Sequence, residues 1–308
     1  MEKILVFGHK NPDTDSICSS IIMANLLNKL GKEAEAVRLG SLNDETKYVM
    51  DYLKIEQTRE ISSVEDGQDI VLVDHNELSQ SVDNRDNANI LAVVDHHRIA
   101  DFKTINPLYY IAKPYGCTAT ILYGLYKENN VDIDKEIAVL MLSAITSDTL
   151  LLKSPTCTEH DVEAFNELEK IAGIDAKAYG LDMLKAGTDT SKYSAQELIN
   201  LDAKEVNEKG KKLIVAQVNT IEIDDVFSRK EEIEFAMEKE INDKKADIMV
   251  LLITDIVNSN SKAIVLGNDK EIAEKAFDKK LDENDSMMLE GVVSRKKQVL
   301  PKLLASID

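Results

Sequence analysis

Short apolar segments alternate with helix-like stretches through the first half of the chain, and this alternation constrains the fold more than any other feature. The strands are predicted at 3–8, 33–39, 69–74 and 89–95, and the helices at 16–30, 44–53, 117–129, 134–147, 159–171 and 175–185. Such alternation is typical of an α/β domain with a mostly parallel sheet that is flanked by helices and covered on both faces. In these sheets a ligand binds at the carboxyl ends of the strands.

A small, polar stretch separates this first half from a second, smaller domain. The segment AGTDTSKYSAQ at 186–196 predicts a linker at 188–195, between domains at 1–187 and 196–308. The second domain begins with a predicted hairpin that turns near Lys209 and Gly210, followed by a helix near 224–243. Strand-like runs at 248–256 and 262–267 complete the pattern. We therefore expect a smaller α/β domain with a mixed sheet.

Composition excludes several classes of function. The chain of 308 residues carries 37 basic and 56 acidic residues, a net charge of −19, which disfavours binding to nucleic acid. No stretch approaches the roughly 18 apolar residues of a membrane span, and the N-terminal apolar run is too short for a secretory signal. The three cysteines are widely spaced, without a C-x-x-C pair, which favours a reducing compartment. We expect a cytoplasmic protein with neither a membrane nor a nucleic acid as its partner.

Three of the predicted parallel strands end in residues of the types that bind metal ions. The sequence GHKNPDTD at 8–15 follows the first strand, Asp74 ends another, and Asp95-His96-His97 closes a third. Taken alone, the first motif also fits a solvated loop with a capping aspartate, and Asp74 also fits a turn. Because the ends of parallel strands converge, the three motifs together favour one metal site.

A fourth acid and the mixture of ligand types indicate which metal this is. Asp148 follows a long apolar helical run from Ile137 to Ile145, and a buried aspartate in that setting needs a partner such as a metal ion. Two histidines from separate loops and several carboxylates suit a pair of Mn²⁺ or similar ions better than Mg²⁺ or Ca²⁺. Paired ions of this kind are the usual means of phosphoryl hydrolysis.

These motifs resemble those of the DHH phosphoesterase superfamily, which combines DHH after a strand with an upstream HxxxDxD and an Asp at an intervening strand end. The C-terminal GVVSRKKQ at 291–298 narrows the resemblance to the family II, manganese-dependent inorganic pyrophosphatases. The resemblance to this family covers the whole chain. The resemblance implies two metal ions, the first held by His9, Asp13, Asp74 and Asp148 and the second by Asp15, Asp74, His96 and Asp148. It also implies that His97 faces the substrate and that Lys204, Arg295 and Lys296 bind pyrophosphate.

The implied reaction is hydrolysis of inorganic pyrophosphate to two orthophosphates by a hydroxide that two metal ions activate. The three cations and a Mg²⁺ that arrives with the substrate would balance the charge on the phosphates. His97 is the candidate general acid, and Asp95 would orient a histidine. The resemblance implies two Mn²⁺ per chain, with Co²⁺ as the alternative, and a homodimer.

Two other functions stay open on the sequence alone. An exopolyphosphatase, or another phosphoesterase of small phosphates, would share the metal ligands. The nucleic-acid and dinucleotide branch of the superfamily differs, because it carries a GGGH-type motif and none of the 12 glycines here is adjacent to another. A regulatory metal-binding module without turnover is the rival of a different class, and the intact ligand set argues against it.

Several remaining residues have plainer interpretations. A basic run such as Arg295-Lys296-Lys297 is usually a solvated surface, but this one follows a strand-like apolar segment after Gly291, which suggests a positioned edge. Cys18 and Cys117 are predicted to be small buried residues, and His160 a surface residue at a helix start.

Overall fold

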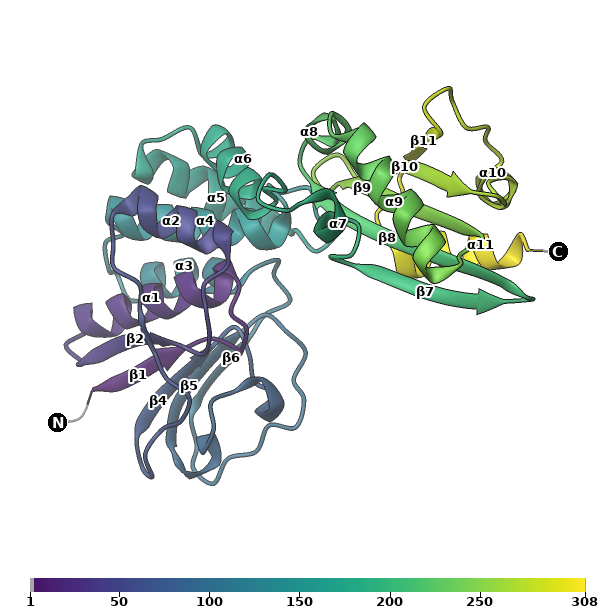
Figure 1. The fold of residues 1–308 in the computed structure, drawn as a ribbon. Coiled ribbons are helices and arrows are strands. Elements are labelled where there is room, and N and C mark those ends of the chain that lie inside the picture. Colours follow the sequence, from purple (N-terminus) through teal and green to yellow (C-terminus); the bar gives the residue numbers. More distant parts are fainter. Residues whose placement is uncertain (1–2, 308) are drawn as a thin grey trace. The chain divides into compact units, whose positions relative to one another are not determined.

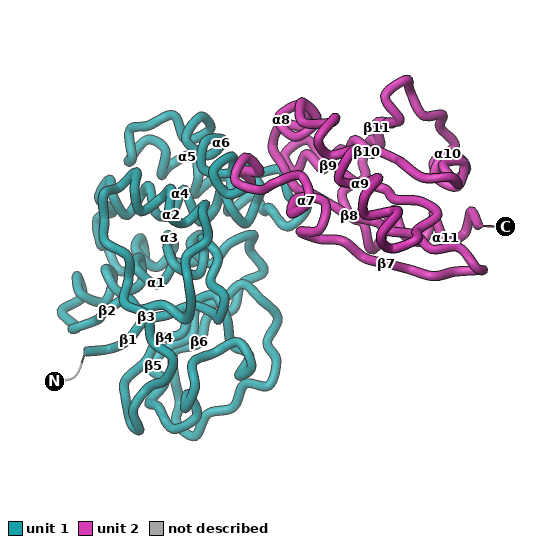
Figure 2. Tube along the Cα trace, in the orientation of Figure 1, with its two compact units in different colours: residues 1–187 teal, residues 188–308 magenta. Residues whose placement is uncertain are grey.

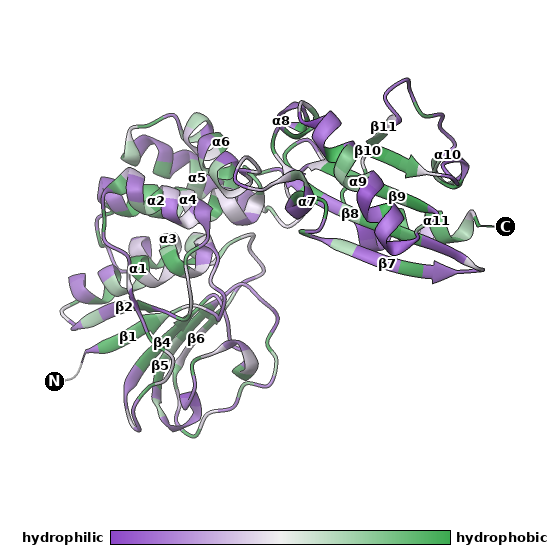
Figure 3. Ribbon diagram, viewed as in Figure 1, coloured by the Kyte–Doolittle hydropathy of each residue, from purple (hydrophilic) through white to green (hydrophobic). Residues whose placement is uncertain are grey.

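Each half of the chain folds into a unit with its own sheet. The computed structural model describes residues 3–307, and the chain divides between Gly187 and Thr188 into two compact units (Figure 2). Apolar residues gather along the central strands of both sheets (Figure 3). Within residues 3–307, no helix combines the length and the apolar character that crossing a membrane requires.

The first unit is built on a six-stranded sheet whose paired strands are all parallel, in the order β3-β2-β1-β4-β5-β6. The strands are β1 (Ile4–Phe7), β2 (Ala34–Arg38), β3 (Arg59–Glu60), β4 (Asp69–Val73), β5 (Asn89–Asp95) and β6 (Tyr109–Ala112). The helices are α1 (Thr14–Lys29), α2 (Asp44–Leu53), α3 (Thr118–Glu128), α4 (Lys135–Thr149), α5 (Glu159–Ala172) and α6 (Ala176–Gly187). This architecture confirms the predicted α/β class, and it sets β1, β4 and β5 side by side.

The two faces of this sheet are covered in different ways. Helices α1 and α3 pack on one face, and α4 packs on α1 as part of a second helical layer (Figure 1). On the other face Phe7, Leu72 and Val93 form an apolar core with residues from 61–64 and 82–110. Apart from the strands β5 and β6, these segments are loops and the short 3₁₀ helix Arg85–Asn87, so the long helices account for only one covered face.

The turn from β1 into α1 requires a close approach of two backbone segments. A Cβ atom added at Gly8 would lie 1.8 Å from Ser16 Oγ, so only glycine fits there. Ser16 Oγ accepts a hydrogen bond from the backbone N–H of His9 at 2.8 Å, and the backbone N–H of Ser16 donates to Asp13 Oδ1 at 2.9 Å. Asp13 is therefore the N-cap of α1, and the same contacts fix the loop that carries His9.

The second unit contains a five-stranded sheet in the order β11-β10-β9-β8-β7. Strands β8 and β9 are parallel and the other neighbours are antiparallel, which confirms the predicted mixed sheet. The strands are β7 (Ala203–Glu208), β8 (Lys211–Thr220), β9 (Ile248–Asp255), β10 (Asn260–Gly267) and β11 (Ser286–Glu290). The helices are α7 (Ala195–Leu198), α8 (Ile223–Phe227), α9 (Lys230–Lys244), α10 (Glu271–Phe277) and α11 (Leu300–Ala305). The central strand β9 is buried at every position.

The single helix predicted for 224–243 is wrong, because α8 and α9 are separate. Helix α8 ends at Phe227, and Oγ of the following residue, Ser228, donates to the carbonyl oxygen of Asp225 at 3.0 Å. The next side chain, Arg229, donates to the carbonyl oxygens of Thr190 and Tyr193 at 3.1 and 2.9 Å. This anchor between distant segments interrupts the helix, and helical periodicity does not reveal it.

Candidate metal centre

The candidate site lies at the carboxyl ends of β1, β4 and β5, the three adjacent strands whose ends carry ligand-type residues. Loops after these strands supply four of the side chains, and the first turn of α1 and the last turn of α4 supply one carboxylate each. The structure brings together all six residues that the resemblance implies as metal ligands: His9, Asp13, Asp15, Asp74, His96 and Asp148. Asp148 lies within the helix rather than after it.

The potential ligand atoms form three overlapping groups that all contain Asp74, and the third of these consists of Asp74, His96 and His97. In the first group, His9 Nε2 lies 3.4 Å from Asp13 Oδ2 and 3.4 Å from Asp74 Oδ2. In the second group, His96 Nε2 lies 3.4 Å from Asp74 Oδ1 and 3.6 Å from Asp148 Oδ2, and Asp15 belongs to the same group. The two oxygens of Asp74 therefore face different histidines.

Backbone carbonyl groups determine which nitrogen of each histidine faces the site. Nδ1 of His9 lies 2.8 Å from the carbonyl oxygen of Lys10, and Nδ1 of His96 lies 3.0 Å from that of Tyr115. A carbonyl oxygen can only accept a hydrogen bond, so Nδ1 carries a proton in both rings. Nε2 is then the nitrogen directed at the carboxylates, the arrangement found in histidines that bind metal ions.

The groups around Asp74 do not balance the negative charge of its carboxylate. Asp74 is 1% exposed, and its Oδ2 has no hydrogen-bond partner among the described residues. Burial, together with the negative charges of Asp15 and Asp13, raises the pKa of Asp74 well above its usual value. Burial and the charges of Asp15 and Asp74 raise the pKa of Asp148 in the same way.

These observations test whether a metal ion fits the site. A buried carboxylate oxygen without a hydrogen bond, such as Asp74 Oδ2, is costly, and a cation between the acids would remove the repulsion that raises their pKa values. Carboxylate oxygens with one imidazole nitrogen, in the group around His9 and in the group of Asp15, Asp74, His96 and Asp148, form a mixed donor set that suits a divalent transition metal such as Mn²⁺. The residues present therefore fit metal ions.

Supporting contacts fix two of the shared or buried carboxylates. Asp74 adopts a left-handed backbone conformation (φ 57°), which aspartate tolerates better than most residues, and Thr118 Oγ1 donates to its Oδ1 at 3.1 Å. Asp15 accepts hydrogen bonds from the backbone N–H groups of Thr118 and Ala119, at 2.8 and 3.3 Å, at the start of α3. Sequence patterns did not predict these partners, because about a hundred residues separate Thr118 from Asp15.

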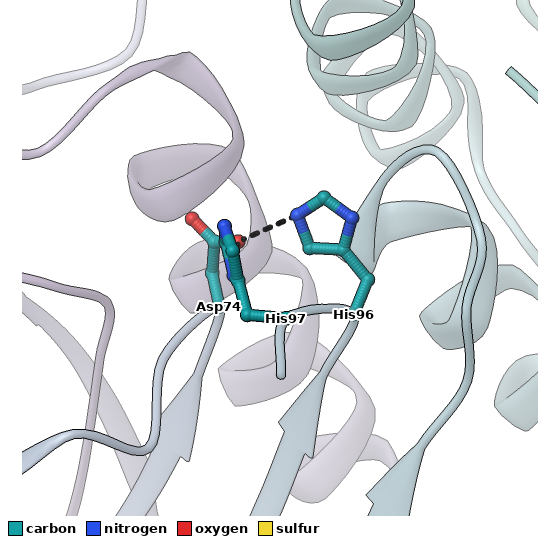
Figure 4. A group of neighbouring side chains, drawn as sticks. All are labelled: Asp74, His96 and His97. Atoms are coloured by element: carbon teal, nitrogen blue, oxygen red, sulfur yellow. Dashed lines mark ion pairs between the residues drawn. The ribbon is translucent and has the colours of Figure 1, made fainter. Parts of the chain in front are cut away.

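His97 lies beside Asp74 and His96 but is held differently (Figure 4). Its Nδ1 lies 3.0 Å from Asp95 Oδ1, and its backbone N–H donates to the same oxygen at 3.0 Å. Burial would raise the pKa of Asp95, but hydrogen bonds from His97 and Asn76 outweigh burial and lower it. Asp95 is therefore an ionised acceptor for Nδ1–H of His97. The ring is 52% exposed, whereas those of His9 and His96 are each 14% exposed.

His75, Cys18 and Cys117 are buried, and His160 lies on the surface. His75 has both ring nitrogens engaged, Nδ1 2.9 Å from the carbonyl oxygen of Val73 and Nε2 3.0 Å from Ser81 Oγ, and burial lowers its pKa to about 4. Cys18 and Cys117 are fully buried, as predicted. His160 is exposed in the first turn of α5, also as predicted.

The cations that the resemblance implies for substrate binding lie in the second unit. Arg295 Nη1 lies 2.7 Å from Asp202 Oδ1, two residues before Lys204 of β7. The backbone N–H of Arg295 donates to the side chain of Gln217, on the neighbouring strand β8, at 3.0 Å. These contacts hold Arg295 close to the start of β7, while the side chains of Lys204 and Lys296 are exposed.

The prediction of a strand-like segment between Gly291 and the basic run is wrong. Residues 292–294 are irregular, and Arg295–Val299 form a short π-helix. Gln298 Oε1 accepts hydrogen bonds from the backbone N–H groups of Val293 and Ser294 at 2.9 and 3.0 Å, and so replaces the partners that a strand would have had. Single turns of π-helix occur often at functional sites.

Comparison with known proteins places both halves of the chain in described families. Residues 3–145 match the model of the DHH family, N-terminal domain, and residues 181–306 match that of the DHHA2 domain. A manganese-dependent inorganic pyrophosphatase of Bacillus subtilis is 56% identical over 304 residues, which are 98% of each chain.

Solved structures agree with these matches. A crystal structure from Methanococcus jannaschii, assigned to the family II inorganic pyrophosphatases, is 41% identical, with a TM-score of 0.63 over 98% of each chain. An exopolyphosphatase-related protein from Bacteroides fragilis has a TM-score of 0.51 over 98% of this chain and 92% of its own. At 17% identity, that second likeness concerns the fold alone.

The charge balance of the site predicts how the stability of the metal-free protein depends on pH. The raised pKa values of Asp74 and Asp148 mean that these two carboxyl groups hold more protons in the folded chain than in the unfolded chain above about pH 4. Their contribution to the free energy of unfolding should therefore fall as the pH rises above about 4. We expect chelator-treated protein to melt at a lower temperature at pH 8 than at pH 5, and Mn²⁺ to raise the melting temperature more at pH 8.

Matched variants separate this effect from the overall negative charge of the chain. Asp148→Asn should reduce the difference between pH 5 and pH 8 in the metal-free protein. Asp243→Asn, which removes an exposed carboxylate on α9, should leave the difference nearly unchanged. An equal reduction in both variants would contradict the assignment of the effect to the site.

Proposed function

This chain belongs to the family II, manganese-dependent inorganic pyrophosphatases of the DHH superfamily, and on that premise we propose that it hydrolyses inorganic pyrophosphate to two orthophosphates. One observation of the structure carries the proposal. Two groups of carboxylate and imidazole ligand atoms share Asp74 at the converging ends of three parallel strands. A shared carboxylate between two groups is the arrangement that a dinuclear hydrolase needs.

We propose that two divalent ions bind per chain. The first would be held by His9, Asp13 and Asp74, whose ligand atoms lie within 4.8 Å of one another, and by Asp148, which only the resemblance adds to this set. The second would be held by Asp15, Asp74, His96 and Asp148. Mn²⁺ is the proposed metal, with Co²⁺ as the alternative and Mg²⁺ arriving with the substrate. When bound, such ions supply Lewis acidity, which lowers the pKa of water towards neutrality and offsets phosphate charge.

The residues around the site have separate proposed tasks in this reaction. The departing phosphate needs a proton, and we propose that His97 donates it from Nε2 as the general acid. Asp95 accepts the Nδ1–H bond of His97 and so fixes the tautomer and the orientation of the ring.

The negative charge of pyrophosphate also has to be balanced by the protein. We propose that Lys204, Arg295 and Lys296 bind its phosphate oxygens, Arg295 through its planar fork and the lysines as point charges. Residues 1–187 would then form the catalytic metal-binding domain, 188–195 the linker, and 196–308 the substrate-binding domain. Residues 188–194, which join α6 to α7, form neither helix nor strand, as suits a connecting segment.

We also propose that the enzyme is a cytoplasmic homodimer. Strand β6 is the edge of its sheet and pairs only with β5 among the described residues, so its other edge can pair with a second copy. Ile99, Ile105 and Tyr109, on or before this strand, are 60%, 98% and 53% exposed. Light scattering should give twice the chain mass of 34.4 kDa, and a monomer mass would contradict the proposal. Cell fractionation tests the compartment.

The sharing of Asp74 predicts the metal content of two variants. Asp13→Asn should leave about one ion per chain, because Asp13 belongs to the first group only and asparagine still caps α1. Asp74→Asn should lose both ions, since its oxygens face both groups. Elemental analysis after dialysis against limiting Mn²⁺ measures this. One fully occupied ion in Asp74→Asn would contradict the sharing.

The proposed substrate predicts a clear preference in an assay of phosphate release. With Mn²⁺ present, we expect pyrophosphate to be cleaved far faster than tripolyphosphate, long polyphosphate, ATP or a dinucleotide. Lys296→Ala should raise the KM for pyrophosphate by on the order of tenfold, because a charge-assisted contact is lost. Lys297→Ala, its exposed neighbour, is the matched control and should change KM little.

Two results would overturn these assignments separately. Comparable rates on long polyphosphate would make the chain an exopolyphosphatase. Equal KM values for the wild type and Lys296→Ala would remove Lys296 from the substrate site.

A further inference from the structure

Asn76 joins the segment after β4 to the segment after β5. The residue is 1% exposed, and both N–H donors and the oxygen of its side-chain amide form hydrogen bonds with residues 95–100. Its Nδ2 donates to Asp95 Oδ2 at 2.6 Å and to the carbonyl oxygen of Arg98 at 2.8 Å. Its Oδ1 accepts from the backbone N–H of Ala100 at 2.9 Å.

These partners determine the orientation of the amide without ambiguity. Ionised Asp95 and the carbonyl of Arg98 can only accept, and the N–H of Ala100 can only donate. An aspartate at position 76 would keep the acceptor for Ala100. It would also set a carboxylate oxygen against Asp95 Oδ2, where the amide N–H now lies. Only an amide satisfies all three partners.

Arg85 holds the backbone of Asn76 in turn. Its Nη1 donates to the carbonyl oxygen of Asn76 at 2.8 Å, and its guanidinium lies 5.5 Å from the ring centre of Phe102, in the loop that follows the histidines. Arg85 is itself 1% exposed, and a buried side chain of this size is held in place by packing on all sides. The buried side chain of Arg85 therefore fixes the backbone position of Asn76.

Asp95 stands between Asn76 and His97. Its Oδ2 accepts from Asn76, while its Oδ1 accepts from the ring and the backbone of His97. Because a carboxylate is planar and rigid, the bond to Asn76 sets the direction of the oxygen that holds the imidazole. Loss of that bond would let Asp95 rotate and would loosen the ring.

We infer that Asn76 is a positioning residue for the general acid and acts through Asp95 on the orientation of His97. The inference rests on the proposed role of His97 in pyrophosphate hydrolysis. It gives Asn76 no contact with substrate or metal. The expected signature is therefore a lower kcat with an unchanged KM and an unchanged metal content.

A double-mutant cycle tests this with the full-length, Mn²⁺-loaded enzyme. Asn76→Ala and Asn76→Asp are each made in the wild type and in the His97→Gln background. In the wild type, we expect each to lower kcat by on the order of tenfold, the usual effect of removing a partner that orients a catalytic or ligating group. In the His97→Gln background the same changes should have almost no effect, because the group that Asn76 orients is gone.

Two variants separate an effect on His97 from a general loss of stability. Asn76→Asp retains the bond to Ala100, so it loses the contact with Asp95 while keeping that anchor of the loop. Asn28→Ala is the matched control, since Asn28 exchanges two hydrogen bonds with the backbone of Ala34 at the far end of α1. It should lower the melting temperature without changing kcat.

Each outcome decides one point. Equal losses of kcat in both backgrounds, or a loss of metal from the Asn76 variants, would overturn the inference. An unchanged kcat in the Asn76 variants would do the same. If His97→Gln itself leaves pyrophosphate hydrolysis intact, the proposed role of His97 is wrong, and the inference falls with it. An inactive wild type would instead contradict the proposed function.

Discussion

The buried carboxylate of Asp74 is the constraint on which the rest of the site depends. It lies at the end of a central strand with its charge uncompensated, and Asp13, Asp15 and Asp148 surround it. Such a cluster is stable only when cations or protons balance it. The histidines directed at it by backbone carbonyls, and the helix start that holds Asp15, are all arranged around that requirement. The parallel sheet supplies the geometry, because its strand ends bring these segments to one edge.

Asp13 and Asp15 stabilise helix starts and also belong to the groups of possible metal ligands. One residue can therefore have a structural and a functional role here. Asp13 caps α1 through the N–H of Ser16 while its other oxygen lies 3.4 Å from His9. Asp15 accepts N–H groups at the start of α3 while belonging to the second ligand group. Helix starts offer unpaired N–H groups that stabilise an anion, which lets a carboxylate stay ionised beside others.

How far the sequence predicts this site depends on how local each interaction is. His9, Asp13, Asp74 and His96 follow strands directly, so the convergence of parallel strands predicts that they meet. The hydrogen bonds that hold the surrounding carboxylates, such as those from Thr118 to Asp15 and from Asn76 to Asp95, join segments that no periodic pattern in the sequence connects. The same reason explains one of the two errors in the second unit, because Arg229 ends a helix through contacts with 190–193. The other error has a local cause, since Gln298 shapes the π-helix through side-chain hydrogen bonds with Val293 and Ser294, which a periodic pattern does not show.

Charge arithmetic explains how so acidic a chain can act on a polyanion. Asp13, Asp15, Asp74 and Asp148 carry four negative charges when ionised, and two divalent cations carry four positive charges. A site loaded with two such ions, as proposed, would be close to neutral, although the whole chain has a net charge of −19. Lys204, Arg295 and Lys296, the cations proposed to bind pyrophosphate, would then add positive charge for the substrate. Arg295 already shares its charge with Asp202, so the exposed lysines contribute most of the uncompensated positive charge.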